Sequence, residues 1–164
     1  MMREEKGQLS LELRAAIDEI LTRSNNDGSK LVGILLDIQD IIPEHYIPEV
    51  VAYYLAEKLN VKVTNVYDVI SFYASLSEKP RGKYPIQMCE SIVCGVNDNR
   101  LVFDTLQEIL GIGLNESTAD GKYYLECVPC FGACDVAPAV RVNGKVYGHL
   151  NTREKIEAML AELV

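Results

Sequence analysis

Apolar side chains in the first eighty residues recur at the three- and four-residue spacing of amphipathic helices. This spacing predicts four short helices, each with one apolar face. The apolar positions are Leu11, Leu13, Ala16, Ile17, Ile20 and Leu21 in the first helix, Leu31, Leu35, Ile38 and Ile42 in the second, Val51, Tyr54, Leu55 and Leu59 in the third, and Val66, Val69, Ile70 and Tyr73 in the fourth. Because each helix must bury its apolar face, the pattern predicts a small helical bundle.

Local sequence signals predict where these helices begin and end. Ser29 is a candidate N-cap for the second helix, which Pro43 stops, and Thr64 is a candidate N-cap for the fourth. Pro48 suits the first turn of the third helix, where a missing N–H costs little. The aromatic side chains at helical spacing are predicted to be core side chains rather than an interface: Tyr53, Tyr54, Phe72 and Tyr73.

The pattern changes at a turn-rich linker, Lys79-Pro80-Arg81-Gly82. The elements predicted beyond it are a strand over Tyr84–Cys89, a helix over Arg100–Leu110 closed by Gly111, a strand over Lys122–Glu126 after the Asp120-Gly121 turn, a hairpin of residues 140–142 and 146–147 around Asn143-Gly144, and a helix over Arg153–Leu163 capped by Thr152. This order predicts an α+β fold, with an N-terminal helical bundle in residues 1–78 and a thioredoxin-like layer of strands and helices in residues 79–164.

Composition and charge narrow the class of protein. The chain has 164 residues, 48% of them hydrophobic, and a formal net charge of −8. Nucleic acids and anionic membranes reward clustered Lys and Arg, so the acidic balance favours a protein partner with a basic patch instead. No stretch approaches the roughly 20 apolar residues of a membrane span, and the first residues lack a secretory signal. The sequence therefore predicts a cytoplasmic protein with no direct membrane insertion.

All five cysteines lie in the second half of the chain, and none precedes residue 89. An odd count in a reducing compartment favours thiolate chemistry over structural disulfides. Cys89 and Cys94 form a C-x4-C pair just after a predicted strand, and Cys130 and Cys134 form a C-x3-C pair on a second loop. Two pairs of thiolates from two loops suit a cluster of two irons, because each iron takes two sulfur ligands from the protein.

Two other kinds of cysteine site stay open, and three are disfavoured by the sequence. Asn97 stands where a plant-type ferredoxin has its third cysteine, the spacing of Cys127, Cys130 and Cys134 differs from that of four-iron ferredoxins, and no histidine adjoins a cysteine as in a Rieske centre. Structural zinc bound by four cysteines fits the count, which would make the chain a zinc-stabilised assembly module. The run Cys127-Val128-Pro129-Cys130 also matches the dithiol motif of a thiol oxidoreductase, although such a pair normally follows an early strand and opens a helix.

Several segments outside the first cysteine pair carry a more specific pattern through their order and spacing. They are Val66-Tyr67-Asp68-Val69-Ile70-Ser71-Phe72-Tyr73, Lys79-Pro80-Arg81-Gly82-Lys83-Tyr84, Asp120-Gly121-Lys122-Tyr123, Cys130-Phe131-Gly132-Ala133-Cys134 with Ala137-Pro138, and Val142-Asn143-Gly144. With Cys89-x4-Cys94 they cover about residues 28–164. Together they resemble the [2Fe–2S] subunit of NADH dehydrogenases, the 24-kDa-type subunit of respiratory complex I, and its relatives in NAD(P)-linked hydrogenases and formate dehydrogenases.

The resemblance implies one [2Fe–2S] cluster whose ligands are Cys89, Cys94, Cys130 and Cys134. It also implies a flavoprotein partner that binds FMN and NAD(P)H, since this chain has no G-x-G-x-x-G fingerprint of its own. The chain would then be non-catalytic alone and would exchange single electrons as a subunit of an NAD(P)H-dependent oxidoreductase, an NADH dehydrogenase or a hydrogenase. Such a subunit would be cytoplasmic, or peripheral to the inner membrane through a larger complex.

Two positions depart from the family's usual pattern. Ser91-Ile92-Val93 replaces a Gly-Thr-Ala run between the first two cysteines, so this loop lacks the usual glycine. Cys127 is an additional cysteine, and we interpret it as a small, partly buried side chain with no part in metal binding.

Residues beside the cysteines predict the electronic properties of the cluster. Gly95 and Gly132 would let backbone amides approach the sulfurs. Glu90, Glu126 and Asp135 would disfavour the extra negative charge of the reduced cluster if they lie near it, although each is equally readable as an ordinary solvated charge. The expectation is a one-electron couple of low potential, on the order of −400 mV.

Overall fold

The computed structural model describes residues 9–163. The chain forms two compact units, the first ending at Pro80 and the second beginning at Arg81, and the change falls within the turn-rich linker. Each unit has a hydrophobic core of its own. None of the helices in residues 9–163 combines the length and the apolar character that a bilayer crossing needs.

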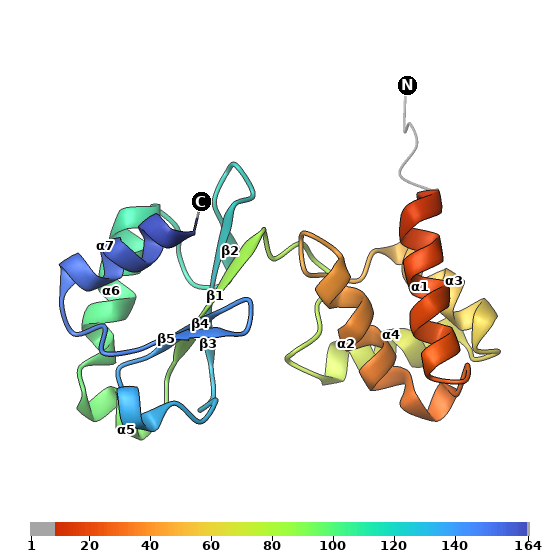
Figure 1. The fold of residues 1–164 in the computed structure, drawn as a ribbon, viewed down its shortest axis with the longest axis horizontal. Helices are drawn as coiled ribbons and strands as arrows, with labels where there is room; N and C mark the ends of the chain where they lie inside the picture. The colour runs from red at the N-terminus through yellow and green to blue at the C-terminus, as the bar shows by residue number, and fades with distance from the viewer. Residues whose placement is uncertain (1–8, 164) are drawn as a thin grey trace. The chain divides into compact units, whose positions relative to one another are not determined.

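The four predicted helices of the first unit all form (Figure 1). They are α1 (Leu11–Arg23), α2 (Leu31–Ile41), α3 (Glu49–Lys58) and α4 (Val63–Phe72), with a short 3-10 turn, η1 (Gly28–Lys30), before α2. Each helix contributes a side chain that is fully shielded from solvent, among them Ile17, Leu35, Val51 and Val66. The predicted helical bundle is therefore confirmed, and its core lies where the four apolar faces meet.

Two predicted helix caps are wrong, and a third residue is displaced by one position. Asp27, not Ser29, caps the chain before α2: its carboxylate accepts a 2.9 Å hydrogen bond from the Ser29 N–H, which starts η1 ahead of the helix. Thr64 lies inside α4, whose N-cap is Lys62. Pro48 is the N-cap of α3 rather than a member of its first turn.

The prediction that the aromatic side chains are core fails for three of the four. Phe72 is 79% exposed, Tyr53 55% and Tyr73 40%, whereas Tyr54 is partly buried. Phe72 lies two residues beyond the buried Ile70 and so points away from its side of the helix, and Tyr73 is the C-cap of α4. Helical spacing alone did not distinguish these end positions from the apolar face.

A buried glutamine ties α2 to the segment that leaves the bundle. The Gln39 side chain is 5% exposed; its Nε2 donates to the Ser75 carbonyl at 2.8 Å, and its Oε1 accepts from the Ser77 N–H at 2.8 Å. Both ends of the amide are therefore satisfied by backbone groups more than thirty residues away. The pair of bonds fixes the end of the first unit against its own helix.

We expect Gln39→Ala to destabilise the protein by about 2–4 kcal/mol, because it removes two buried hydrogen bonds at once. Urea unfolding followed by far-ultraviolet circular dichroism would measure the change. The matched control is Asp40→Ala at the neighbouring exposed position of α2, which should change the free energy of unfolding by no more than about 0.5 kcal/mol. Equal effects of the two substitutions would contradict the role given to Gln39.

The second unit is a five-stranded sheet with helices against it (Figure 1). Its strands, in the spatial order β2-β3-β1-β4-β5, are β1 (Tyr84–Cys89), β2 (Glu116–Ser117), β3 (Tyr123–Val128), β4 (Val140–Val142) and β5 (Lys145–Tyr147). Its helices are α5 (Ile92–Val96), α6 (Asn99–Leu110) and α7 (Arg153–Glu162), with a 3-10 turn, η2 (Cys134–Val136). Strands β1 and β3 are parallel and the other neighbours antiparallel, which confirms the thioredoxin-like α+β prediction.

Turn residues account for much of this topology. Gly111 ends α6 in the left-handed conformation, with φ +66°, and Asn143 and Gly144 both have positive φ in the tight turn between β4 and β5, as predicted. Thr152 lies at the N-cap of α7, but its hydroxyl makes no bond to the helix backbone. The short elements β2 and α5 were not predicted, because two to five residues carry too little periodicity.

One face of the sheet packs on α6 and α7. Ile86 and Met88 of β1 contact the same core as Leu106 of α6 and Ile156 of α7, and all four are fully buried. Because side chains alternate along a strand, the residues between them point to the opposite face. The carboxyl ends of the two parallel strands, β1 and β3, lie side by side and lead directly into the two cysteine loops.

Candidate iron–sulfur site

The first cysteine pair lies where β1 passes into α5. Cys89 is the last residue of β1 and Cys94 lies inside α5, so a short helix, and not the predicted open loop, presents the second sulfur. The side chains of both residues are buried, at 3% and 2% exposure. Asn99, the first residue of α6, donates from Nδ2 to the Cys89 carbonyl at 3.0 Å and holds the end of the strand in place.

The second pair lies on the loop that follows β3. Cys130 and Cys134 are exposed, and their Sγ atoms are 3.3 Å apart. Gly132 adopts φ +91°, which turns its N–H onto the Cys130 sulfur at 3.4 Å. A residue with a side chain would be strained at this φ, so the glycine is what allows the amide to reach the sulfur.

The two cysteine pairs adjoin each other, because they follow the carboxyl ends of the neighbouring parallel strands β1 and β3. The Gly132 amide lowers the pKa of Cys130, and hydrogen bonding with the Cys134 and Cys89 side chains lowers it further. Burial raises the pKa of Cys94, and the Cys89 and Cys134 thiols raise it further. The sulfurs of both loops therefore lie within interaction range of one another.

A close backbone contact positions the second loop. The His149 N–H donates to the Val136 carbonyl at 2.6 Å, and the Leu150 N–H donates to the Pro138 carbonyl at 3.1 Å. Gly148 lies so close to this segment that a Cβ atom would be 2.4 Å from the Cβ of Val136. Val136 belongs to the same 3-10 turn as Cys134, so this contact sets the position of that sulfur.

The donor set fits a diiron cluster. Thiolate is the ligand that iron–sulfur clusters take. Two thiolates on one tetrahedral metal, with metal–sulfur bonds of about 2.3 Å, would be about 3.8 Å apart. The Sγ atoms of Cys130 and Cys134 are near this separation, at 3.3 Å. Within residues 9–163, no three His, Cys, Asp or Glu side chains are grouped as a site for a single metal ion. A cluster with two irons does not need such a group, because it spreads four thiolates over two metals.

The surroundings of Cys127 differ from those of the other four cysteines. It is a residue of β3, partly buried against the core of the second unit, and burial raises its pKa, with Glu90 and Glu126 adding to the shift. A thiol whose pKa is raised is a poor nucleophile at neutral pH. The partner of Cys130 in the structure is Cys134, which does not favour the Cys127–Cys130 dithiol.

The expectations for the glycines and acidic residues beside the cysteines are met in part. The Gly95 N–H donates to the Ser91 carbonyl within the first turn of α5, not to a sulfur, whereas the expectation for Gly132 is met. Glu126 is not a solvated charge: it is 6% exposed and lies 3.6 Å from the buried guanidinium of Arg81. Glu90 and Asp135 are exposed, as ordinary solvated charges would be.

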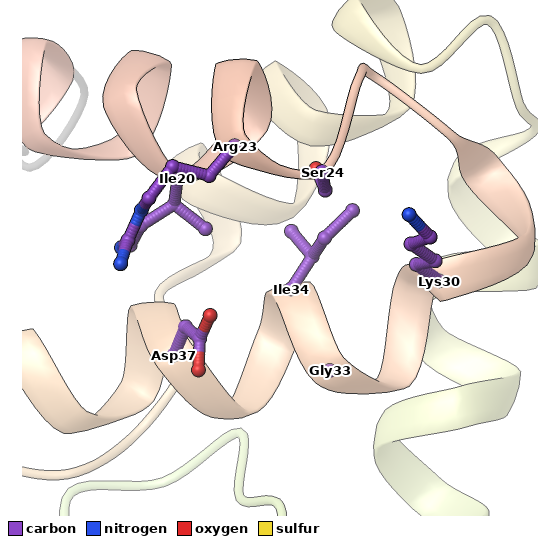
Figure 2. Close-up of a pocket in the computed structure, with 7 residues that line it drawn as sticks. All are labelled: Ile20, Arg23, Ser24, Lys30, Gly33, Ile34 and Asp37. Atoms are coloured by element: carbon purple, nitrogen blue, oxygen red, sulfur yellow. The ribbon is translucent and has the colours of Figure 1, made fainter.

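The first unit has a hollow between α1 and α2, of about 260 Å³. Figure 2 shows Ile20 and Arg23 of α1 on one side and Ile34 and Asp37 of α2 on the other. No cysteine or histidine is among its lining residues, and the sequence pattern does not predict a site there. It is a gap between two helices whose charged side chains reach toward solvent.

The comparisons with known proteins define the class. The family model of the thioredoxin-like [2Fe–2S] ferredoxins matches residues 17–164. The chain therefore belongs to the thioredoxin-like [2Fe–2S] ferredoxin family, and its cofactor is a [2Fe–2S] cluster. The family assigned from the sequence is confirmed, and so is the type of cofactor.

Particular relatives are parts of larger enzymes. The chain is 35% identical to the NADP-reducing hydrogenase subunit HndA of Solidesulfovibrio fructosivorans, over 80% of this chain and 75% of that one. It is 38% identical to the NADH-quinone oxidoreductase subunit 2 of Thermus thermophilus (66% of this chain, 60% of the relative) and 35% identical to an NADH-quinone oxidoreductase subunit of Pseudomonas aeruginosa (65% and 61%). The chain thus spans only about three-fifths of the last two relatives.

A solved structure supports the fold. The crystal structure of an NAD+-reducing [NiFe]-hydrogenase in its air-oxidized state contains a chain that matches with a TM-score of 0.70 at 19% sequence identity. The match covers 82% of this chain and 22% of the hydrogenase chain. At this identity the likeness concerns the fold alone.

Proposed function

We propose that the protein is an electron-transfer subunit in which Cys89, Cys94, Cys130 and Cys134 hold one [2Fe–2S] cluster. The observation that carries the proposal is the meeting of two thiol pairs at the carboxyl ends of two parallel strands, with the Gly132 amide donating to one sulfur. Amide donation to a sulfur stabilises the more negative, reduced state of a cluster. When bound, the cluster supplies a one-electron couple.

The chain's own residues supply ligands and surroundings for that couple. Buried Cys89 and Cys94 attach one side of the site to the sheet and to α5, and exposed Cys130 and Cys134 leave the other side open to a partner. The sequence has no dinucleotide fingerprint, so binding of NAD(P)H and FMN falls to a flavoprotein partner. The names of the relatives, which belong to NADH-quinone oxidoreductases and to an NADP-reducing hydrogenase, support such a complex. The chain alone would be non-catalytic.

An exposed apolar surface also lies beside the buried cysteine pair, on α5. Ile92, Val93 and Val96 of α5 flank the buried Cys94 and are 85%, 42% and 82% exposed. Exposed apolar side chains grouped around a functional site mark a contact surface. We assign this surface, where the family's usual Gly-Thr-Ala run is replaced by Ser91-Ile92-Val93, to docking of the flavoprotein.

Metal analysis and electron paramagnetic resonance test the function. Protein purified without oxygen should contain two irons and two acid-labile sulfides per chain, and dithionite should produce one unpaired spin per chain. The midpoint potential should be low, on the order of −400 mV. A colourless protein containing zinc would establish the assembly module instead, and a protein without iron or sulfide would refute the proposal.

We expect Ile92→Glu to weaken docking about tenfold, because it puts a charge into an apolar contact. The measurement is the FMN that co-purifies with a tagged copy of the chain from its native host. Val146→Glu is the control, since Val146 is also an exposed apolar residue of the second unit but lies on β5. FMN recovery that is unchanged for Ile92→Glu, or equally reduced for both, would contradict the docking surface.

A further inference from the structure

A line of polar side chains crosses the face of the sheet opposite α6 and α7. Gln87 of β1 is in register with Glu126 of β3 on one side and with Arg141 of β4 on the other. Its neighbours along β1, Ile86 and Met88, belong to the core on the other face. Polar residues aligned on three adjacent strands bond side by side rather than to solvent, so their positions fix one another.

Hydrogen-bond chemistry sets the direction of this line. The Gln87 Nε2 donates to the Glu126 carboxylate at 2.7 Å, and its Oε1 accepts from the Arg141 Nε at 2.7 Å. A guanidinium only donates and an ionised carboxylate only accepts, so the amide of Gln87 satisfies both partners in one orientation. The second oxygen of Glu126 lies 3.6 Å from the Arg81 guanidinium, and this pair is nearly excluded from solvent.

The line ends at the cluster loop. The Arg141 guanidinium carbon lies 5.0 Å from the centre of the Phe131 ring, within the range of a cation–π contact. Phe131 stands between Cys130 and Gly132, the residue whose amide donates to the Cys130 sulfur. A guanidinium held by Gln87 can therefore hold the ring, and with it the turn that delivers this amide.

We propose that Arg141 is a positioning residue for the cluster: through Phe131 it fixes the Gly132 amide against Cys130, and its charge favours the reduced state. The inference rests on the proposed function of the four cysteines. The ion pair between Arg81 and Glu126 holds the Glu126 carboxylate in place, and this carboxylate keeps the Gln87 amide oriented. Arg141 is not one of the four proposed ligands, and it acts through the ring and through its charge.

The Arg141→Met variant tests the positioning role with two measurements that report on the cluster loop rather than on overall stability. In the cluster-loaded protein, hydrogen exchange at the Gly132 amide should become about tenfold faster. A change of this size corresponds to the loss of the cation–π contact together with part of the hydrogen bonding that holds Arg141. The midpoint potential should fall, because a nearby positive charge no longer offsets the added electron. Arg141→Lys, which keeps the charge but not the planar fork, should recover most of the potential and little of the exchange protection.

Two further variants keep the test decisive. Phe131→Leu should speed Gly132 exchange to the same extent, and adding Arg141→Met to it should bring no further increase, since the contact is already lost. Lys122→Met is the matched control: it removes a cation 4.9 Å from a tyrosine ring at the opposite end of β3 and should leave both readings unchanged. A loaded protein with unaltered exchange and potential in Arg141→Met would overturn the inference alone, whereas wild-type protein that never binds iron would overturn the proposed function.

Discussion

Replacing Cys94 by serine should abolish the cluster, with iron and labile sulfide falling together to background. The side chain is 2% exposed and is held inside α5, so no other thiol can turn to take its place. A serine hydroxyl is a harder ligand than a thiolate and stays protonated at neutral pH. The same loss is expected for serine at Cys89, Cys130 and Cys134, and metal analysis with electron paramagnetic resonance after dithionite reduction would measure it.

Cys127→Ser is the internal control for these four variants. Cys127 is closer in sequence to Cys130 than Cys94 is to Cys89, yet it packs against the core of the second unit. Its replacement should leave iron content intact and cost only stability, about 1–2 kcal/mol for a partly buried polar substitution. A Cys127→Ser protein without its cluster would show that the ligands have been assigned wrongly.

The sequence was sufficient wherever a few neighbouring residues decide the structure. Gly111 ends a helix, Asn143-Gly144 closes a hairpin, and the apolar spacing of the first eighty residues forms a bundle, because each depends on local conformational preference. The position of Cys89 and Cys94 just after a strand could likewise be predicted, since β1 ends at Cys89. The same local reasoning chose the wrong N-caps at Thr64 and Ser29. The residue that caps a helix depends on where its first turn begins, and α4 and the 3-10 turn before α2 both begin earlier than these residues suggest.

The features that sequence reasoning missed are contacts between distant segments. Glu126 is buried only because Arg81 and Gln87, both about forty residues earlier, meet it across the sheet. Nothing around Arg141 in the sequence indicates that it lies over Phe131. The short helix α5 was not predicted because five residues cannot display a helical period, although it decides that Cys94 is buried while Ile92 is exposed.

Outside the cysteines, Gly148→Ala is expected to be the change that most disturbs the second cysteine pair. An added Cβ would lie 2.4 Å from the Cβ of Val136 and 2.8 Å from its carbonyl oxygen, and real Cβ atoms do not approach so closely. Val136 must therefore move, and the 3-10 turn that contains Cys134 moves with it. We expect a loss of about 1–3 kcal/mol from overpacking and faster release of iron to a chelator than from the wild-type protein.

Gly95→Ala supplies the contrast, because proximity in sequence would predict the reverse order of effects. Gly95 adjoins Cys94, but a Cβ atom there would meet nothing within 4 Å, and the residue lies in a helix, where alanine is favoured over glycine by up to about 1 kcal/mol. Iron release should therefore be as slow as in the wild type. If Gly95→Ala released iron faster than Gly148→Ala, the position of the second cysteine pair would not depend on the contact between Gly148 and Val136.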